Sequence, residues 1–325
     1  MGGAHSHRCR AHACAQSVPG PRRDVRSPLF LVTVVRDILS HQGCHALQSL
    51  GGHGVLLAFD FDGTLAPLKP HPDLVRVPSS VDRALRTLAS LGPVAIVSGR
   101  SLSDLRRCFP RFPGSLVGNH GAEGLLAHRA ALRSARRACS VWRPHLRRLL
   151  HNADGAWLED KVFSFTVHSR SPSALHIFER YFTREVLRSL PPIRFLPGKA
   201  SINLLPLQMP HKGDALMLLL KRARAQSGLF VGDDETDEEA FAAARRRMIT
   251  VRVGRGGRTR ATFLLGSQRE IGRLLAVLIR VRRSSPAFAG SRRCKSTEEC
   301  VDFSAAASAG SASDRRRRLS EKPPA

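Results

Sequence analysis

Short apolar runs alternate with helical patterns along this chain of 325 residues. The apolar run Val55–Phe59 is followed by a helical pattern at residues 80–90 and by a second apolar run, Val94–Val97. A further helical pattern begins at Ser101 and leads to a third run, Ser115–Val117. Strands that alternate with helices at this spacing are joined by crossover connections, which make neighbouring strands parallel. This part of the sequence therefore predicts an α/β fold built on a parallel sheet.

The segment that follows has a different pattern. Residues 162–168 alternate small or polar side chains with bulky apolar ones, which predicts a half-exposed strand. A helical pattern at residues 173–190 comes next, before the chain becomes extended again. We therefore predict a smaller α+β domain at residues 125–204, inserted into a core that consists of residues 29–124 and 205–283.

After this insertion the α/β pattern resumes. We expect helices at residues 212–225, from Asp237 onward and at 269–282, and strands at residues 229–231 and 249–253. In the first half of the core, Ser79 precedes Asp82 by three residues, which predicts a capping box at the start of the helix near residue 80.

Both ends of the chain lack the periodicity of folded elements. Residues 1–28 form a basic leader of mixed Arg, His, Cys, Pro and Gly, and residues 284–325 are rich in Ser, Ala and Arg, so we expect both to be disordered. No apolar run approaches the roughly 18 residues that cross a bilayer. The odd count of seven cysteines disfavours a disulfide framework. We therefore expect a cytoplasmic protein with no membrane partner.

The formal net charge of +26 makes a nucleic-acid partner a hypothesis to weigh, because clustered Lys and Arg release counterions from phosphates. The basic residues are mostly arginines spread over the whole chain, with few aromatic side chains among them. Proteins that bind single strands instead interleave stacking rings with charge. We therefore expect no specific nucleic acid as a partner, and a cationic surface that steers anionic substrates.

Two aspartates directly follow the first apolar strand. Asp60 and Asp62 belong to the string Asp-Phe-Asp-Gly-Thr at the carboxyl end of Val55–Phe59, and parallel sheets bind ligands outside such ends. Asp60 can attack phosphorus through its carboxylate, and Asp62 can protonate a leaving oxygen. The alternative is an ordinary acidic turn. We predict that Asp60 is a nucleophile and that Asp62 is a general acid.

Two candidate phosphate-binding residues lie near helix starts. Ser98 follows Val94–Val97, where a hydroxyl and the N–H groups of a helix N-terminus can hold a phosphoryl oxygen. Lys212 precedes an amphipathic helix, and its ammonium could neutralise a transferring phosphoryl group and keep Asp60 ionised. Taken alone, Ser98 also fits a helix cap and Lys212 a surface residue.

A further acidic string, Gly-Asp-Asp-Glu-Thr-Asp-Glu-Glu at residues 232–239, follows the strand expected at 229–231. Oxygen ligands crowded at a strand end suit Mg²⁺. A helix whose first turn is acidic to match its dipole would explain residues 237–239, but it explains Asp233 and Asp234 poorly. Because each motif follows a strand or begins a helix of one alternating sheet, we predict a single site with Mg²⁺ as its cofactor.

In this order, the motifs resemble those of the trehalose-6-phosphate phosphatases, a family of the haloacid dehalogenase (HAD) superfamily. The resemblance covers residues 50–282 and rests on FDFDGTLAP at 59–67, SGRS at 98–101, GNHGAE at 118–123 and GDDETDE at 232–238. Within the insertion, LEDK at 158–161 and HSR at 168–170 are similar as well.

This resemblance implies a Rossmann-like HAD core with a parallel sheet and a cap that closes over a disaccharide phosphate. It implies that Mg²⁺ is held by Asp60, by the backbone carbonyl of Asp62 and by Asp233, with Asp234 close by. The substrate-binding residues that it implies are Gly99, Arg100, His120, Gly121, Glu123, Glu159, Lys161, His168, Arg170 and Lys199.

One position departs from the family pattern. Members usually carry an acid a few residues after the Gly-Lys pair that corresponds to residues 198–199, where this chain has Asn203. An amide can still hydrogen-bond a sugar hydroxyl, but it alters the expected specificity of the cap.

The resemblance thus implies an Mg-dependent phosphatase that converts trehalose 6-phosphate to trehalose in trehalose biosynthesis. A HAD phosphatase for another sugar phosphate, such as sucrose phosphate or a hexose phosphate, is the alternative. An arginine-driven nucleic-acid binder is a third hypothesis. The four acids Asp60, Asp62, Asp233 and Asp234 disfavour it, because they repel polyanions unless a metal intervenes. We expect a small-molecule sugar phosphate as the partner of a monomer or weak oligomer.

Overall fold

The computed structural model describes residues 35–52, 54–69, 71–125, 128–151, 155–169, 191–198, 201–255 and 257–285. The leader expected at residues 1–28, most of the tail expected at 284–325 and the helix expected at 173–190 lie outside these residues.

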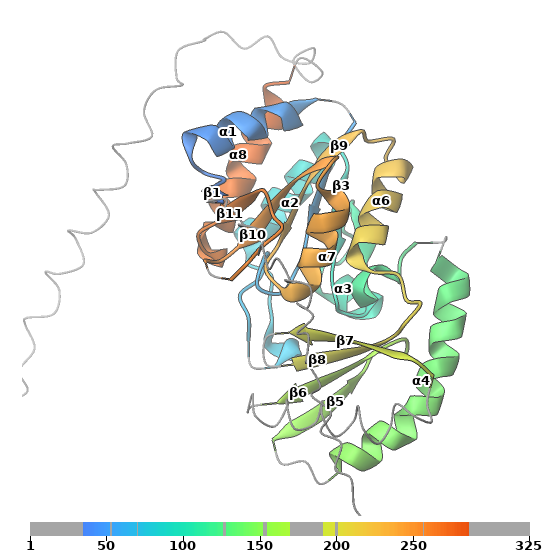
Figure 1. The fold of residues 1–325 in the computed structure, drawn as a ribbon. Helices are drawn as coiled ribbons and strands as arrows, with labels where there is room; N and C mark the ends of the chain where they lie inside the picture. Colours follow the sequence, from blue (N-terminus) through green and yellow to red (C-terminus); the bar gives the residue numbers. More distant parts are fainter. Residues whose placement is uncertain are drawn as a thin grey trace, which may run out of the picture. The chain divides into compact units, whose positions relative to one another are not determined.

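Among the described residues, seven strands form one parallel sheet in the order β1-β11-β10-β9-β2-β3-β4 (Figure 1). The strands are β1 (Arg36–Asp37), β2 (Val55–Phe59), β3 (Val94–Val97), β4 (Ser115–Val117), β9 (Ser227–Gly232), β10 (Met248–Val253) and β11 (Phe263–Leu265). The helices that accompany them are α1 (His41–Gln48), α2 (Ser79–Leu91), α3 (Leu102–Cys108), α6 (Lys212–Arg222), α7 (Glu235–Ala244) and α8 (Ile271–Arg283). The predicted parallel α/β fold is confirmed.

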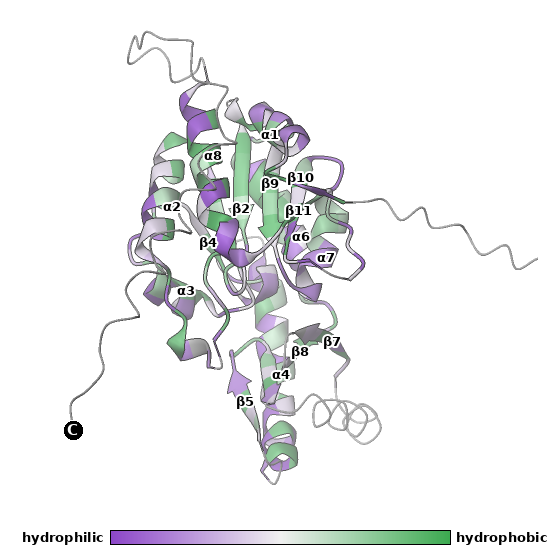
Figure 2. Cartoon of the chain, turned by 90° about the vertical axis from the view of Figure 1, so that its left-hand side faces the viewer, coloured by the Kyte–Doolittle hydropathy of each residue, from purple (hydrophilic) through white to green (hydrophobic). Residues whose placement is uncertain are grey.

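The two faces of this sheet bury two separate apolar clusters. All five residues of β2 are buried, and successive side chains of a strand point to opposite faces. Leu57 packs in a cluster with side chains of α2 and α8, whereas Leu56 packs in a cluster with side chains of α6 and α7. Figure 2 shows β2 and β9 as strongly hydrophobic strands. Continuous apolar runs therefore become central strands covered by helices on both sides.

The order of the strands brings the motifs together. β2 lies between β9 and β3. Asp60, Asp233 and Ser98 are the first residues after these three strands. Because the carboxyl ends of parallel strands meet at one edge of a sheet, the three side chains lie at the same edge.

A second, antiparallel sheet belongs to the inserted cap. Its order is β5-β6-β8-β7, with β5 (Ala156–Asp160), β6 (Phe165–Ser169), β7 (Ile193–Gly198) and β8 (Ser201–Pro206). Helix α4 (Arg129–Leu150) packs on this sheet, and its Trp142 is buried against Phe165 and Leu204. The α/β core thus carries an inserted domain of mixed α and β structure, as predicted.

Helix α4 was not predicted from the amino-acid sequence. Seven of its 22 residues are arginine, and Pro144 lies inside it, so charged side chains interrupt the apolar ones along its whole length. Its buried stripe is narrow and consists of Ala135, Cys139, Trp142, Leu146 and Leu150, spaced three or four residues apart.

None of the helices that the structure describes is long and apolar enough to cross a membrane.

Two local predictions were wrong. The strand expected at residues 162–168 begins only at Phe165, because Val162 has a positive φ of 71° in a turn that precedes it. The expected capping box at Ser79 is absent: α2 begins at Ser79 itself after Pro78, and Asp82 pairs with Arg86 at 2.8 Å. The short elements β1, α1 and β11 were also missed.

A buried arginine ties α8 to the sheet. Arg282 is 3% exposed, and its guanidinium donates to the carbonyl oxygens of Leu88, Val55 and Pro93 at 2.9, 3.0 and 3.2 Å. Burial lowers the pKa of Arg282 to about 10, so the side chain remains charged at neutral pH. Arg282 therefore supplies donors to three carbonyl groups where α2, α8 and the sheet meet.

Replacing Arg282 by Met should lower the free energy of unfolding by about 2 to 4 kcal/mol, because the carbonyl oxygens would stay buried without these donors. Urea denaturation measures the change. Arg283→Met is the control, since Arg283 is exposed, and it should shift the stability by less than about 0.5 kcal/mol. Equal losses in the two variants would contradict this role of the guanidinium.

Candidate active site

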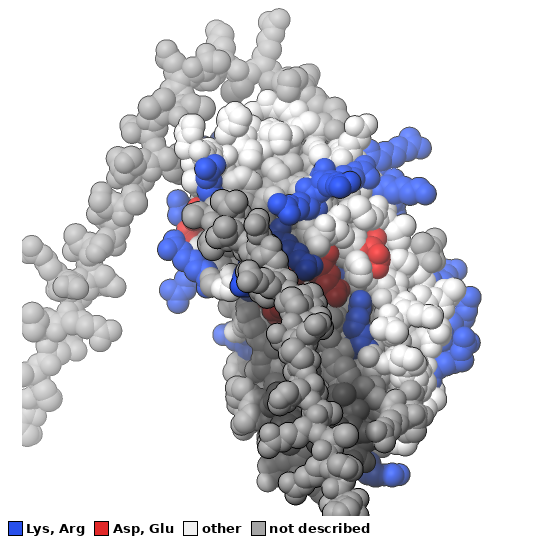
Figure 3. All heavy atoms as spheres, in the orientation of Figure 1, with Lys and Arg blue, Asp and Glu red and all other residues white. Residues whose placement is uncertain are grey.

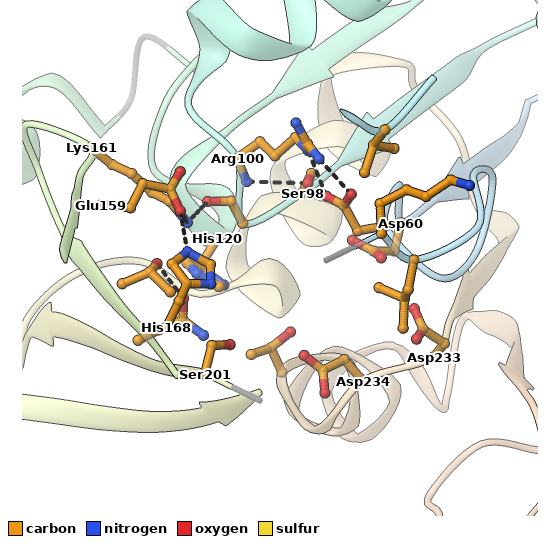
Figure 4. A pocket seen from close by; sticks show the side chains of 18 of the residues that line it. Asp60, Ser98, Arg100, His120, Glu159, Lys161, His168, Ser201, Asp233 and Asp234 are labelled. Atoms are coloured by element: carbon orange, nitrogen blue, oxygen red, sulfur yellow. Dashed lines mark hydrogen bonds and ion pairs between the residues drawn. The ribbon is translucent and has the colours of Figure 1, made fainter. Parts of the chain in front are cut away.

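A cavity of about 520 Å³ lies between the carboxyl edge of the core sheet and the cap sheet (Figure 4). A volume of this size accommodates a small organic ligand. Its core side includes Asp60, Ser98 and Lys212, and its cap side includes Glu159 and His168. Residues from all four sequence motifs and from the cap therefore line one cavity.

Asp60 and Lys212 form a buried ion pair on the core side. The Asp60 N–H donates to the Val231 carbonyl oxygen at 2.8 Å, which extends the pairing of β2 with β9 by one residue. Lys212 is the first residue of α6, whose start is fixed by a capping box between His211 and Asp214. Its Nζ lies 2.7 Å from Asp60 Oδ1, and the two side chains are 3% and 5% exposed.

Asp237 completes this cluster, although its side chain was read from the sequence as part of an ordinary acidic helix turn. It is fully buried and accepts from Lys212 Nζ at 2.8 Å. Its other oxygen accepts from the N–H groups of Asp233 and Asp234 at 2.9 and 3.0 Å. The available signal was the spacing, because Asp234 is the N-cap of α7 and Asp237 is three residues later in a capping box.

The charges in this cluster shift one another's pKa values. Burial raises the pKa of Asp60 well above its ordinary value; Lys212 opposes this, and Asp237 and Asp233 add to it. Burial alone would lower the pKa of Lys212, but the carboxylates of Asp237 and Asp60 raise it. Three carboxylates around one ammonium leave surplus negative charge, which a divalent cation would compensate.

The donor set fits Mg²⁺. Oxygen atoms of Asp60, Asp233 and Asp237 lie within 4.8 Å of one another, and all three residues are buried. Thr64 Oγ1 donates to Asp233 Oδ1 at 3.1 Å, which orients that carboxylate. Asp234, also expected near the ion, lines the cavity and accepts from the Glu235 N–H at 2.8 Å. The cluster of carboxylates therefore shares Asp60 and Asp233 with the predicted set, adds Asp237 and does not include the side chains of Asp62 and Asp234.

Asp62 lines the cavity beside Asp60, and both of its oxygens face Arg100. Arg100 Nε and Nη2 donate to Asp62 Oδ2 and Oδ1 at 2.7 and 2.8 Å. The Arg100 guanidinium also lies over the ring of Phe61, 5.1 Å from its centroid. Arg100 thus lines the cavity, and its side chain is directed at an acid of the first motif.

Ser98 and Gly99 form the loop between β3 and α3. Ser98 is buried, and its N–H donates to the Val117 carbonyl oxygen at 2.9 Å. A side chain at position 99 would place its Cβ 2.6 Å from Cε1 of His120, so this position requires glycine. The imidazole of His120 therefore lies directly against the loop that carries Ser98.

His120 is buried at the edge of the cavity with a left-handed φ of 56°. Neither ring nitrogen has a hydrogen-bond partner among the described residues. Burial, together with the nearby ammonium groups of Lys161 and Lys212, lowers the pKa of His120 well below its ordinary value. The imidazole is therefore neutral at physiological pH.

On the cap side, Glu159 and Lys161 of the same strand region meet His168. His168 Nε2 lies 2.8 Å from Glu159 Oε2, and Lys161 Nζ lies 3.7 Å from that oxygen. Burial alone would raise the pKa of Glu159, but the contacts with His168 and Lys161 lower it. Lys161 Nζ also donates to the Gly99 carbonyl oxygen at 3.0 Å, which links the cap to the core.

Other predicted residues have different surroundings. Gly121 and Glu123 are absent from the lining of the cavity, and Glu123 Oε2 instead accepts from the Leu102 N–H and from Asn119 Nδ2 at 2.8 and 2.6 Å. Asn203 lines the cavity, but its Oδ1 accepts from Thr166 at 2.8 Å and its Nδ2 donates to Leu196 at 3.3 Å. Arg170 and Lys199 lie outside the described residues.

Trp157 of the cap was not predicted as a site residue, and it forms a wall of rings with His168 and His71. The Trp157 ring stacks on His168 with centroids 4.9 Å apart and 13° between the planes. His71, from the core, lies 5.3 Å from the same indole. All three rings line the cavity.

Positive charge is spread widely over the surface. On the face drawn in Figure 3, Lys and Arg side chains occupy several separate areas, and acidic side chains are few. A nucleic-acid interface would gather its basic residues into one patch or stripe. The described residues visible in this view do not form a single patch of this kind, and their scattered charge fits the steering of small anions better.

Known proteins resemble this chain in both sequence and structure. A family model described as trehalose-phosphatase matches residues 58–262, more than half of the chain. Trehalose-6-phosphate phosphatase of Escherichia coli is 32% identical over 217 residues, which cover 64% of this chain and 80% of that protein. An uncharacterized glycosyl hydrolase of Mycobacterium tuberculosis is 32% identical over 232 residues, 66% of this chain and 18% of that protein.

Among solved structures, the C-terminal domain of Candida albicans trehalose-6-phosphate phosphatase matches with a TM-score of 0.63 at 20% identity. The match covers 75% of this chain and 98% of that domain. At this level of identity the likeness concerns the fold.

Replacing Asp237 by Ala should destabilise the protein by about 3 kcal/mol, because Lys212 would lose one of two buried counter-charges and two N–H groups would lose their acceptor. Thermal or urea unfolding measures the change. Glu235→Ala is the matched control in the same helical turn: Glu235 is exposed, and its loss should cost less than about 0.5 kcal/mol. If both variants unfold alike, Asp237 does not organise the cluster.

Proposed function

The chain belongs to the trehalose-phosphatase family, and we propose that it hydrolyses trehalose 6-phosphate to trehalose and phosphate in trehalose biosynthesis. The observation that carries this proposal is the buried Asp60 carboxylate, which lies 2.7 Å from Lys212 in a cavity whose opposite side includes Glu159, Lys161 and His168. An acid in this position can attack a phosphate ester whose sugar contacts the cap.

In the first step, Asp60 attacks phosphorus, and the bond between phosphorus and the sugar oxygen breaks. Asp62 gives its proton to that oxygen, so trehalose leaves as a neutral alcohol. In the second step, water attacks the phosphorus of the aspartyl-phosphate, and Asp62 takes a proton from the water. Phosphate leaves, and Asp60 is free as a carboxylate again.

Positive charge and hydrogen-bond donors balance the phosphoryl group during both steps. Lys212 Nζ already contacts Asp60, so it is placed to contact an oxygen of a phosphoryl group bound there. The Ser98 hydroxyl lines the same part of the cavity and can donate to another oxygen. Both residues are therefore assigned to phosphate binding.

We further propose that Mg²⁺ is the cofactor, held by Asp60, by the backbone carbonyl of Asp62 and by Asp233, with Asp234 close by. A bound Mg²⁺ supplies positive charge that offsets the repulsion between a carboxylate nucleophile and a phosphate dianion. Asp237 supports this arrangement through Lys212 and through the N–H groups of residues 233 and 234.

The assignment of domains follows from the same proposal. Residues 29–124 and 205–283 act as the catalytic core, and residues 125–204 act as the cap that selects the sugar. Glu159, Lys161 and His168 would contact sugar hydroxyls, together with Arg170 and Lys199 by resemblance.

The odd cysteine count supports a cytoplasmic location.

Hydrolysis of another sugar phosphate is the second candidate, and one observation favours it. Asn203 stands where the family usually has an acid, and its amide is engaged by Thr166 and Leu196 within the cap sheet. A panel of sucrose, hexose and trehalose phosphates separates the two candidates. A role in nucleic-acid binding has no comparable support.

Replacing Asp60 by Asn should abolish release of phosphate from trehalose 6-phosphate, because an amide cannot form the aspartyl-phosphate. The assay uses purified protein with Mg²⁺ and measures inorganic phosphate, while thermal unfolding checks that the variant is folded. Wild-type protein should be active. Turnover by the folded variant at a tenth of the wild-type rate would refute Asp60 as the nucleophile.

Replacing Glu159 by Ala should lower kcat/KM for trehalose 6-phosphate by about 10- to 100-fold, because buried sugar hydroxyls would lose a partner. Hydrolysis of para-nitrophenyl phosphate, which is too small to need the cap, should change far less. Asp160→Ala is the control: Asp160 is the exposed next residue and pairs with Arg143 outside the cavity. Equal losses on both substrates would place specificity elsewhere.

A further inference from the structure

One arginine holds both oxygens of the Asp62 carboxylate. The two bonds from Arg100 measure 2.7 and 2.8 Å and come from Nε and Nη2, which form a fork with two parallel donors. The side chains are 10% and 29% exposed, so the pair is shielded but Asp62 still reaches the cavity. A fork of this kind fixes the plane of a carboxylate as well as its position.

Arg100 is itself held on several sides. Its N–H donates to Ser98 Oγ at 3.2 Å, and its carbonyl oxygen accepts from the Asn119 N–H at 2.7 Å. Its guanidinium lies over Phe61, whose ring is fully buried. The backbone and the head group are therefore both anchored, and the fork is organised before any substrate binds.

We propose that Arg100 is a positioning residue that holds the carboxyl group of Asp62 at the oxygen of the leaving sugar. This inference rests on the proposed function, in which Asp62 protonates that oxygen. Two of the five N–H donors of Arg100 are used on Asp62, and this bidentate contact is the observation that points to a role through Asp62.

The chemistry leaves Arg100 unchanged. When the bond between phosphorus and the sugar oxygen breaks, the proton moves from Asp62 to that oxygen, and Asp62 becomes a carboxylate that both donors of the fork stabilise. When water attacks the aspartyl-phosphate, Asp62 takes one proton from the water. Each carboxylate oxygen has a second lone pair, so the two bonds to Arg100 leave room for this exchange.

The loss of activity expected without Arg100 depends on the leaving group of the substrate. A sugar alkoxide or a phenolate leaves poorly and needs the proton, whereas para-nitrophenolate leaves well without it. Replacing Arg100 should therefore lower kcat/KM more strongly when the leaving group is more basic. A residue that merely maintained the fold, or one that bound the sugar, would not produce this pattern.

The test compares Arg100→Met, Arg100→Lys, Asp62→Asn and the double variant Arg100→Met with Asp62→Asn. Substrates are trehalose 6-phosphate, phenyl phosphate and para-nitrophenyl phosphate, with Mg²⁺. The measured quantity is kcat/KM, because it covers only the steps up to departure of the leaving group. Arg86→Met, at an arginine that pairs with Asp82 outside the cavity, is the control.

For Arg100→Met we expect a loss on the order of 100-fold with trehalose 6-phosphate and phenyl phosphate, and of about threefold or less with para-nitrophenyl phosphate. Arg100→Lys keeps the charge without the fork and should lose an intermediate amount. The double variant should be no slower than Asp62→Asn alone, because both changes remove the same function.

Losses that multiply in the double variant, or that are equal on both aryl phosphates, would overturn the inference. Equal losses for Asp62→Asn on both aryl phosphates would remove its premise as well. If the wild type cleaves aryl phosphates but not trehalose 6-phosphate, the assigned substrate is wrong, and the aryl pair still decides the role of Arg100.

Discussion

The ammonium of Lys212 lies between the carboxylates of Asp60 and Asp237, and the geometry of the whole site depends on this contact. The three side chains are almost completely buried and come from the start of α6, the end of β2 and the first turn of α7. A single charge in such a place would cost several kcal/mol, so each group needs the others. Charge compensation therefore fixes how two helices and a strand meet at the edge of the sheet.

Much of the core could be predicted from the sequence because its signals are local. Continuous apolar runs such as Val55–Phe59 predict buried strands, and parallel strands deliver the residues that follow them to one edge. Asp60, Ser98, Lys212 and Asp233 accordingly line one cavity. The cap was harder to predict from the sequence for two reasons. The many arginines of α4 hide its narrow apolar stripe, and Val162 lies in a turn although it continues the alternating pattern of the following strand.

The contacts that sequence reasoning missed are tertiary. The capping-box spacing of Asp237 places it in the first turn of α7, but this spacing does not predict its contact with Lys212, which lies 25 residues away in the chain. Glu123 belongs to a motif that resembles a binding site. Its carboxylate, however, accepts hydrogen bonds from the Leu102 N–H at the start of α3 and from the Asn119 amide. The pairing of Arg100 with Asp62, 38 residues apart, likewise follows from the adjacency of β2 and β3.

The close approach of Gly99 to His120 has a consequence for how this site can change during evolution. A methyl group at position 99 would collide with an imidazole that the left-handed backbone at position 120 holds in place. The two positions are therefore not free to drift separately: a descendant that acquires a side chain at 99 must first exchange His120 for something smaller. Residues that lie 21 positions apart in the printed sequence are thus expected to be inherited as a pair.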